Sequence, residues 1–254
     1  MENKEKMYHI NLSKKDIEGA KIAILPGDPG RVGSIAKYLE NPKKISQNRE
    51  YTAYLGNLKD KKVLIISTGM GGPSTAICVE ELAQIGITHL IRVGTSGGMQ
   101  LEVSAGDVVI ATSAIRQEGT SKEYLPIEFP AVADLDVVIA LKNAAQKLNL
   151  NYHTGVVHCK DSFYGQHSPE RMPVSYELQN KWNAWIKGGA LCSEMETSAL
   201  FTVASTLKLH AGAILLVIWN QEREKKGLPQ ENCFDTDREI KVAIEATKEL
   251  LEKF

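Results

Sequence analysis

Disulfide frameworks and membrane-spanning runs are the first features that this sequence lacks. Its 254 residues include four cysteines, no two of which are spaced as a Cys-x-x-Cys clip, and three of them lie in apolar stretches. Such cysteines are typical of reduced, buried thiols. No long apolar run occurs, and residues 1–16 carry no signal-peptide pattern. These absences predict a protein of the reducing cytoplasm that has no membrane partner.

The chain also lacks an excess of charge of either sign. Its 30 Lys and Arg residues nearly balance 31 Asp and Glu residues, which leaves a formal net charge of −1. A balanced chain argues against a basic surface that binds nucleic acid, although it leaves room for a small anion pocket. Nothing indicates low complexity, a linker or a repeat, so residues 1–254 are expected to form one domain.

Short β-branched runs alternate along the chain with segments of helical periodicity. Strands are expected at 21–25, 62–67, 89–94, 107–115, 154–160 and 211–220, and helices at 32–40, 75–86, 136–150, 176–187, 197–209 and 237–254. This alternation predicts a single-domain, three-layer α/β fold with a mixed, largely parallel central sheet. Ligands of such sheets bind beyond the carboxyl ends of the strands. The loops after Leu25, Ser67, Val93, Cys159 and Ile218 are therefore the places to look for a site.

Two of these loops have the residues of an anion pocket. Gly27 lets backbone N–H groups approach a ligand, and Arg31 follows in the same loop, although an ordinary turn with a solvated arginine explains the pattern as well. Arg92 stands inside an apolar strand and needs a counter-charge, so a structural ion pair is its alternative role. Thr95 and the glycines after it add hydroxyl and backbone donors that suit phosphate.

The glycine-rich loop 69–74 does not complete a nucleotide-binding motif. Its third expected glycine is Ser74, and the following strand has Arg92 where an acid should meet the ribose of a dinucleotide. A GxxxxGK[ST] phosphate loop is also absent. These departures favour free phosphate or a small phosphoryl group as the ligand.

Two acids lie close together in the small, apolar stretch CSEMETSAL, residues 192–200. If strand geometry continues to Glu196, then Glu194 and Glu196 line one side of a cleft, and Thr197 caps the helix that follows. The alternative is a pair of first-turn acids favoured by the helix dipole. A carboxylate in the cleft can accept hydrogen bonds from a ligand.

Taken in order, Gly27-Asp28-Pro29, Arg92–Thr95 and Ser193–Thr197 resemble the nucleoside phosphorylase family. The resemblance extends from about His9 to the last helix. Within the family, the segments 48–56, 67–87 and 125–136 resemble the members that act on uridine more than those that act on purine nucleosides. Several matches in the right order are more specific than any single one.

The resemblance implies an active site shared between subunits. It implies phosphate contacts from Gly27, Arg31, Arg92 and Thr95, and from Arg49 of a neighbouring subunit. His9 would reach a neighbour's ribose, and Glu194, Met195 and Glu196 would hold the ribose from their own chain. A dimer would then be the active unit, usually within a homohexamer. A monovalent cation such as K⁺ is implied near Glu50, Met70 and Ser74 at the dimer interface.

The base is expected to be a pyrimidine. The residues matched to base binding are Ser96, Gly97, Phe163, Gln166, Ile218 and Trp219. The family's arginine comes two residues after the glutamine, but this chain has Ser168 there, which leaves Lys160 and Arg171 as alternative cations. Purine-specific members have an acid at the position of Asn220, which cannot protonate a leaving purine. Phe163 has core packing as its alternative role, and the charged segment 223–229 is expected to form either a lid or a solvated loop.

The resemblance thus implies reversible phosphorolysis of uridine, and of 2′-deoxyuridine, in pyrimidine salvage. Phosphate is the co-substrate and no cofactor is expected. The catalytic residues would be Arg92, Gln166 and Glu196, together with Lys160 or Arg171. The alternatives are a purine nucleoside phosphorylase, a nucleoside hydrolase of the same fold and a non-enzymatic nucleoside-binding module.

Overall fold

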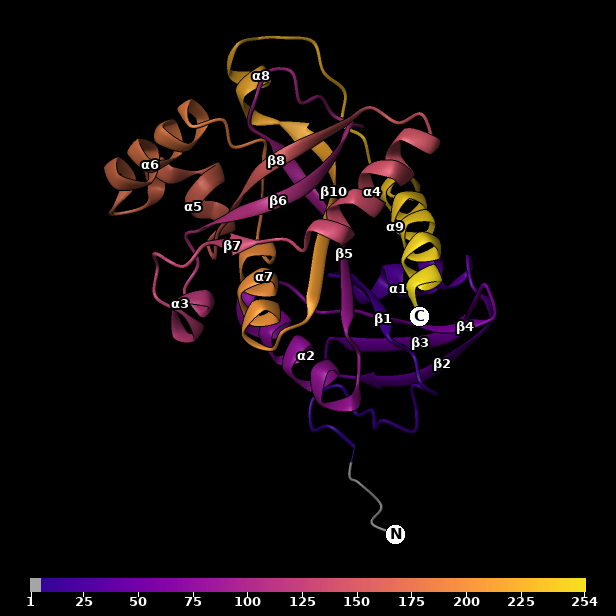
Figure 1. Ribbon diagram of the computed structural model, residues 1–254. Helices are drawn as coiled ribbons and strands as arrows, with labels where there is room; N and C mark the ends of the chain where they lie inside the picture. The colour runs from indigo at the N-terminus through magenta and orange to yellow at the C-terminus, as the bar shows by residue number, and fades with distance from the viewer. Residues whose placement is uncertain (1–5) are drawn as a thin grey trace.

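A computed structural model describes residues 6–254 and contains one extended, mixed β-sheet (Figure 1). Its strands are β1 (Ile22–Pro26), β2 (Glu40–Asn48), β3 (Tyr51–Leu58), β4 (Lys61–Ile66), β5 (His89–Gly98), β6 (Val108–Arg116), β7 (Ala131–Val132), β8 (Tyr152–Cys159), β9 (Cys192–Glu194) and β10 (His210–Asn220). They are arranged in the order β10-β6-β8-β9-β5-β1-β4-β3-β2, with β7 paired to β6. The mixed α/β fold expected from the sequence is confirmed.

Part of the sheet closes on itself. Strand β10 pairs with β6 on one side and with β5 on the other, so β5, β10, β6, β8 and β9 form a ring. The pairs β1–β4, β1–β5, β5–β10, β6–β8 and β8–β9 are parallel, and the other pairs described are antiparallel. Parallel pairing is thus concentrated in the strands whose carboxyl ends surround the site described below.

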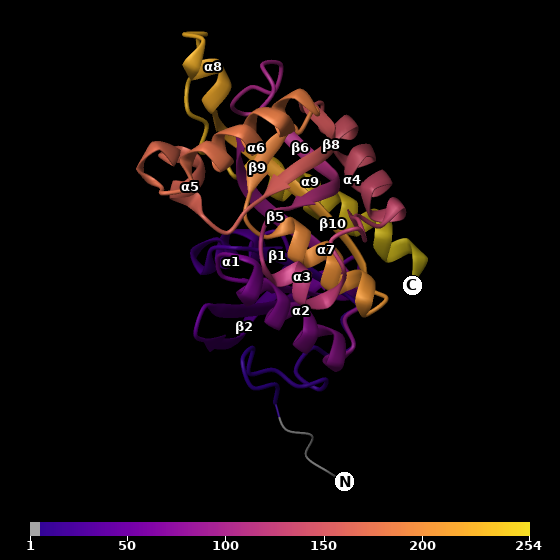
Figure 2. The same ribbon diagram turned by 90° about the vertical axis from the view of Figure 1, so that its left-hand side faces the viewer.

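Helices cover both faces of the sheet. The helices are α1 (Pro29–Ala36), α2 (Gly72–Ile85), α3 (Thr120–Tyr124), α4 (Leu135–Lys147), α5 (Phe163–His167), α6 (Ser175–Lys187), α7 (Thr197–Thr206), α8 (Gln221–Lys225) and α9 (Asp237–Leu250), with 3₁₀ turns at Pro169–Arg171 and Leu251–Lys253. Figure 1 shows α4 beside α9 and α7 beside α2, while α5 and α6 project from the edge of the ring. Figure 2 shows the same projection of α5 from the side.

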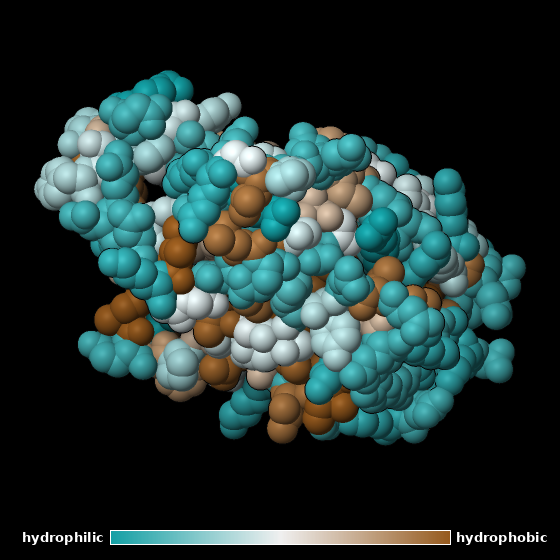
Figure 3. Space-filling model, turned by 90° about the horizontal axis from the view of Figure 1, so that it is seen from above, coloured by the Kyte–Doolittle hydropathy of each residue, from teal (hydrophilic) through white to brown (hydrophobic). Residues whose placement is uncertain are grey.

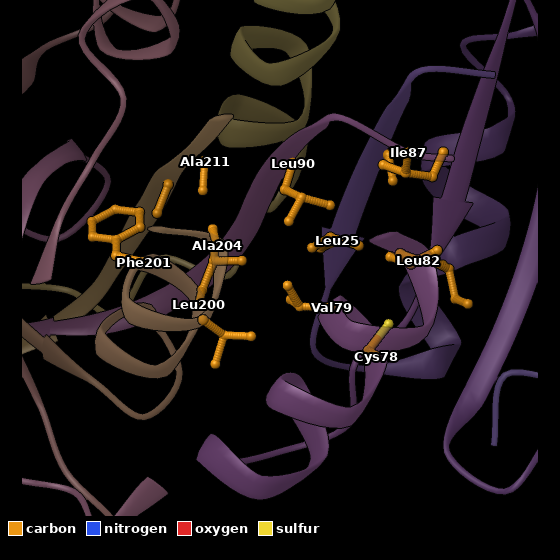
Figure 4. Close-up of a cluster of buried hydrophobic side chains, with 14 of the residues drawn as sticks. Leu25, Cys78, Val79, Leu82, Ile87, Leu90, Leu200, Phe201, Ala204 and Ala211 are labelled. Carbon is orange, nitrogen blue, oxygen red and sulfur yellow. The ribbon is translucent and has the colours of Figure 1, made fainter. Parts of the chain in front are cut away.

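The central strands are apolar along their whole length because both of their faces are buried. In β1, Ala23 and Leu25 belong to the core beneath α2 and α7, whereas Ile22 and Ile24 belong to the core beneath α1, α4 and α9. Figure 4 shows the first of these cores, where Leu25 lies near Val79 of α2. Burial on two faces explains the continuous β-branched runs seen in the sequence.

Most expected elements occur within a few residues of their predicted bounds, but the antiparallel edge of the sheet was missed. Strands β2 and β3 form a hairpin whose outer strand is mostly exposed and has the sequence ENPKKISQN, which has little strand character. Pairing with β3 along one edge, rather than local propensity, makes this segment a strand. No helix among residues 6–254 is long and apolar enough to cross a membrane.

Candidate active site

A cavity of about 830 Å³ lies beyond the carboxyl ends of β1, β4, β5, β8 and β10. All five loops singled out in the sequence contribute to its wall. The lining residues include Gly27, Arg31, Glu50, Met70, Arg92, Thr95, Ser96, Gly97, Lys160, Phe163, Glu194, Met195, Glu196, Ile218 and Trp219. Figure 3 shows the molecule from above, with hydrophobic residues at the foot of the lobe that projects at the left.

Arg92 finds its counter-charge in the two acids of the CSEMETSAL stretch. Its Nε donates to Glu194 Oε2 at 3.1 Å, and its Nη2 pairs with Glu196 Oε2. All three side chains are almost completely buried. Burial acts against the charged guanidinium, but Glu196 and Glu194 raise the pKa of Arg92 above its usual value. The buried strand therefore tolerates its arginine because a later segment delivers two carboxylates to it.

Glu194 acts mainly as a brace for the start of α7. Its carboxylate accepts from Arg92 and from the backbone N–H groups of Glu196 and Thr197, at 2.9–3.0 Å for the N–H groups. Burial acts to raise the pKa of Glu194, but Arg92 and these N–H groups lower it below its usual value. The expected cap at Thr197 is wrong, because α7 begins at Thr197 and Glu196 occupies the cap position. Strand β9 ends at Glu194.

Glu196 faces the cavity. Its Oε1 accepts from the N–H of Gly71 at 2.7 Å, and Gly71 has a φ of 88°, which favours glycine. Burial raises the pKa of Glu196, Arg92 opposes this, and the nearby Glu194 raises it further, so that the pKa lies above its usual value. Glu196 therefore offers a cavity-facing carboxyl group held by two fixed donors.

Two arginines converge at one end of the cavity. A Cβ atom at Gly27 would lie 3.9 Å from both Arg31 Nη2 and Arg92 Nη1, so the two guanidinium groups approach the same glycine. Arg92 Nη1 and Arg31 Nη1 are buried and have no hydrogen-bond partner among residues 6–254. Burial and the adjacent Arg92 lower the pKa of Arg31. Two neighbouring cations, with the unpartnered Nη1 of Arg92 directed at Gly27, suit an anion such as phosphate.

Lys160 and Ser193 also line the cavity, and they contact a cluster of neutral polar groups that lies outside it. Lys160 Nζ donates to Ser193 Oγ at 2.9 Å, and Ser193 Oγ donates to Gln166 Oε1 at 2.6 Å. Ser193 Oγ also contacts His158 Nδ1 at 2.9 Å, and His158 Nε2 contacts Gln117 Oε1 at 2.6 Å. Burial and the charge of Lys160 lower the pKa of His158 to about 3, so this histidine is neutral.

Lys160 separates the main cavity from a second one. The adjoining cavity, of about 580 Å³, is lined by Gln166, Trp182 and Trp185, and it shares Lys160 and His167 with the first. Burial lowers the pKa of Lys160, which Glu194 partly opposes.

Arg171, the other cation expected from the sequence, lines neither cavity. It is exposed on the turn after α5, with its guanidinium 5.9 Å from the ring centre of Tyr164. The geometry thus favours Lys160 over Arg171.

Asn220 lies at the end of β10 but does not face the cavity. Its Nδ2 donates to Gln100 O and Val103 O at 2.8 Å, and its Oδ1 accepts from two N–H groups at the start of α8. The segment 223–229, expected as a lid or a solvated loop, forms part of this anchored turn. Phe234 and Thr236, further along the chain, are the residues that reach the cavity.

The residues expected to serve a neighbouring subunit, His9 and Arg49, lie close to each other and outside the cavity. Tyr8 lies between them, with its ring 4.8 Å from that of His9 and 5.8 Å from the Arg49 guanidinium. His9 Nδ1 contacts Glu81 at 2.7 Å.

The residues expected to hold a monovalent cation lie next to this patch. Arg49 is followed directly by Glu50, whose carboxylate accepts from Ser74 Oγ at 2.8 Å. Met70 is 84% exposed. Two oxygen-bearing side chains are thus brought together beside the residues expected at a subunit interface.

Sequence reasoning did not assign a role to several residues of the site, most of which no local pattern marks. These are Gly71, Gln117, His158, Ser193 and Glu239, the last of which lies behind Arg31. For Ser193 a signal existed, because it stands directly before Glu194 in the CSEMETSAL stretch. Ser193 lies opposite His158 in the β8–β9 register, which brings their side chains together.

Behind Arg31, the carboxyl group of Glu239 on α9 is fully buried. Its Oε1 lies 3.9 Å from Arg31 Nη1, and neither of its oxygens has a hydrogen-bond partner among the described residues. Burial raises the pKa of Glu239 to about 8, although Arg31 opposes the shift. This carboxyl group is therefore mainly neutral at pH 7.

Replacing Arg92 with leucine is expected to destabilise the fold by about 3–5 kcal/mol at pH 7, because Glu194 and Glu196 would be left buried without a cation. The loss should shrink toward pH 5, where the unpaired carboxyl groups take up protons. Urea unfolding at both pH values measures it. Arg31→Leu is the matched control and should cost less, because its neighbour Glu239 is already neutral. Equal losses in the two variants would contradict this account.

A closed strand ring thus borders a cavity lined by two arginines and a buried lysine, an arrangement that suits a small anion beside a polar organic ligand. Residues 21–254 match the family model described as the phosphorylase superfamily, and the chain belongs to that family.

Among its relatives, the uridine phosphorylase of Treponema pallidum is 54% identical over 244 residues, which cover 96% of this chain and 94% of the relative. The uridine phosphorylase of Haemophilus influenzae is 40% identical over 96% of this chain and 98% of its own length. A guanosine phosphorylase of Halorubrum lacusprofundi is 36% identical over 96% of this chain and 99% of its own length. Relatives named for different nucleosides are thus similar over the full chain. Which base this chain accepts must therefore also be inferred from the residues of the site.

Proposed function

We propose that the protein catalyses the reversible phosphorolysis of uridine, and of 2′-deoxyuridine, to uracil and the pentose 1-phosphate. The observation that carries the proposal is the convergence of two guanidinium groups on Gly27, where Arg31 Nη2 and the unpartnered Arg92 Nη1 approach the same glycine in a cavity that Lys160 also lines. The full-length similarity to two uridine phosphorylases supports the same reaction.

In the proposed reaction, phosphate is held by Arg31, Arg92, Thr95 and the backbone at Gly27. Glu196 accepts hydrogen bonds from the ribose hydroxyls, with Met195 beside it. A phosphate oxygen forms a bond to C1′ while the bond from C1′ to N1 of uracil breaks, and the electron pair of that bond leaves with the base. No side chain becomes a covalent nucleophile. The protein contributes orientation and charge stabilisation.

The part of the cavity near Lys160 suits a pyrimidine that leaves as an anion. The uracil of uridine has two carbonyl groups and one N–H, which can bind the amide of Gln166, in the adjoining cavity, and Lys160, which both cavities share. A purine would need an acid near its N7, and Asn220 is an amide committed to the α8 turn. This chemistry favours uridine over guanosine or inosine. The remaining lining near the base is supplied by Phe163, Trp219, Ile218, Ser96 and Gly97.

We further infer that the active unit is a dimer and that these dimers assemble into a homohexamer. We also infer that the protein acts in the cytoplasm. The support is the patch of His9 and Arg49, which lies outside the cavity of its own chain although both residue types suit phosphate and ribose. Glu50 and Ser74, next to this patch, offer oxygen atoms to a monovalent cation. The proposed reaction would serve pyrimidine salvage. A monomer in sedimentation that retains full activity would refute the shared site.

A spectrophotometric assay on uridine, thymidine, inosine and methylthioadenosine, each with and without phosphate, tests the proposed function. Uridine should be cleaved fastest and only when phosphate is present, because phosphate is the attacking group. Cleavage of uridine without phosphate would identify a hydrolase instead. Preference for inosine would identify a purine phosphorylase, and cleavage of none would favour a binding module.

A further inference from the structure

Glu239 stands out because it is a fully buried acid that the proposed reaction does not use. It belongs to α9, whereas Arg31 belongs to α1, and the two meet behind the wall of the cavity. Its carboxylate oxygens have no hydrogen-bond donor among residues 6–254. A buried carboxyl group without donors is costly when ionised, so such a residue needs an explanation.

We propose that Glu239 is a positioning residue whose protonation controls phosphate binding: neutral Glu239 leaves Arg31 free to hold phosphate, and ionised Glu239 competes with phosphate for Arg31. The inference rests on the proposed function, because it takes Arg31 as a phosphate ligand. The inference goes beyond the proposed function because it assigns a role to Glu239, which does not line the cavity.

The geometry supports competition because one guanidinium group faces both partners. Arg31 Nη1 lies 3.9 Å from Glu239 Oε1, while Arg31 Nη2 faces Gly27, near Arg92 Nη1. A charge on Glu239 would attract the guanidinium toward α9 and would repel a phosphate anion in the cavity. Both effects weaken phosphate binding, and both vanish when the carboxyl group carries a proton.

Burial, with a smaller contribution from two nearby acids, keeps the proton on Glu239 near neutral pH. Burial is the largest cause, and it raises the pKa to about 8, with smaller upward contributions from Asp235 and Asp237 at the start of α9. The nearby backbone N–H of Glu239 and the charge of Arg31 act in the opposite direction. Arg92, Asp28 and Glu196 act on the pKa of Arg31 from the cavity side. A bound phosphate would add a further negative charge, which favours the protonated form of Glu239.

The expected result is a pH-dependent difference between the wild type and Glu239→Gln in the KM for inorganic phosphate. At pH 7 the two values should agree within about twofold, because the glutamine mimics the neutral acid. At pH 9 the wild-type value should be about three- to tenfold higher, since up to one unit of pKa coupling corresponds to a factor of ten. The KM for uridine should differ little between Glu239→Gln and the wild type, and this small difference should be the same at both pH values.

Asp237→Asn is the matched control. It removes another acid near the start of α9, but Lys241 and Tyr38 hold the pKa of Asp237 below its usual value, so this group stays ionised throughout the range. Because Asp237 makes only a small contribution to the pKa of Glu239, the rise of the phosphate KM between pH 7 and pH 9 should persist in this variant, whereas it should be lost in Glu239→Gln. A constant ratio between Glu239→Gln and the wild type from pH 7 to pH 9 would overturn the proposal.

Calorimetry of inorganic phosphate binding to the wild type tests the idea without a variant and without turnover. At pH 9, in buffers of different ionisation enthalpy, the protein should take up a fraction of a proton as phosphate binds. Binding without proton uptake would overturn the proposal. Failure of the proposed function is recognised separately, because the protein would then bind phosphate with proton uptake but would not cleave uridine.

Discussion

Replacing Lys160 with methionine is expected to lower kcat/KM for uridine phosphorolysis by about 10²–10³, the usual cost of removing one donor to a developing anion. Lys160 is 5% exposed and lies between the main cavity and Gln166. Methionine keeps the length and the burial of the side chain but removes its charge. Steady-state kinetics measure the loss, and thermal unfolding shows whether the variant is folded.

The leaving base provides a readout that a purely structural role would not move. Fluorine at C5 stabilises the uracil anion, so 5-fluorouridine needs less help from a cation. The factor lost in Lys160→Met should therefore be smaller for 5-fluorouridine than for uridine. Arg171→Met is the matched control and should leave both substrates nearly unaffected, because Arg171 is exposed and lies outside both cavities. The reverse pattern would assign the base to Arg171.

Glu196→Gln is expected to lower kcat/KM for uridine by about 10², because the glutamine cannot serve as a charged acceptor for the ribose hydroxyls and weakens the pair with Arg92. The hydrogen bond from Gly71 can persist, so the fold should survive. With 2′-deoxyuridine, which lacks one of the two hydroxyls, the loss should be smaller. Near-normal kinetics with uridine would remove Glu196 from the sugar site.

Glu194→Gln provides the contrast. Its carboxylate accepts from Arg92 and from two backbone N–H groups, so the variant should lose stability, by about 1–3 kcal/mol for each group left poorly satisfied. Its activity should fall less than that of Glu196→Gln once folded protein is compared with folded protein. Urea unfolding and kinetics on both variants distinguish the structural role of Glu194 from the sugar-binding role of Glu196.

The sequence predicted the location of the site more accurately than the contacts within it. The five loops after buried strands all reach the cavity, because parallel strands place their carboxyl ends at one edge of the sheet. The need of Arg92 for a counter-charge was also predictable, since an arginine in an apolar strand cannot stand alone. Its partners, Glu194 and Glu196, come from about a hundred residues further along the chain.

Local sequence patterns were enough to establish the alternation of buried strands and helices, the glycine and arginine loops, and the lack of an acid at Asn220. The three-dimensional arrangement was needed to learn that the sheet closes through β10, that Glu194 braces α7, and that Lys160 rather than Arg171 lies in the cavity. The physical reason is that local patterns encode which face of a strand or helix is buried, whereas ion pairs and shared hydrogen bonds depend on distant segments meeting in space. The contact between Glu239 and Arg31 is of this second kind.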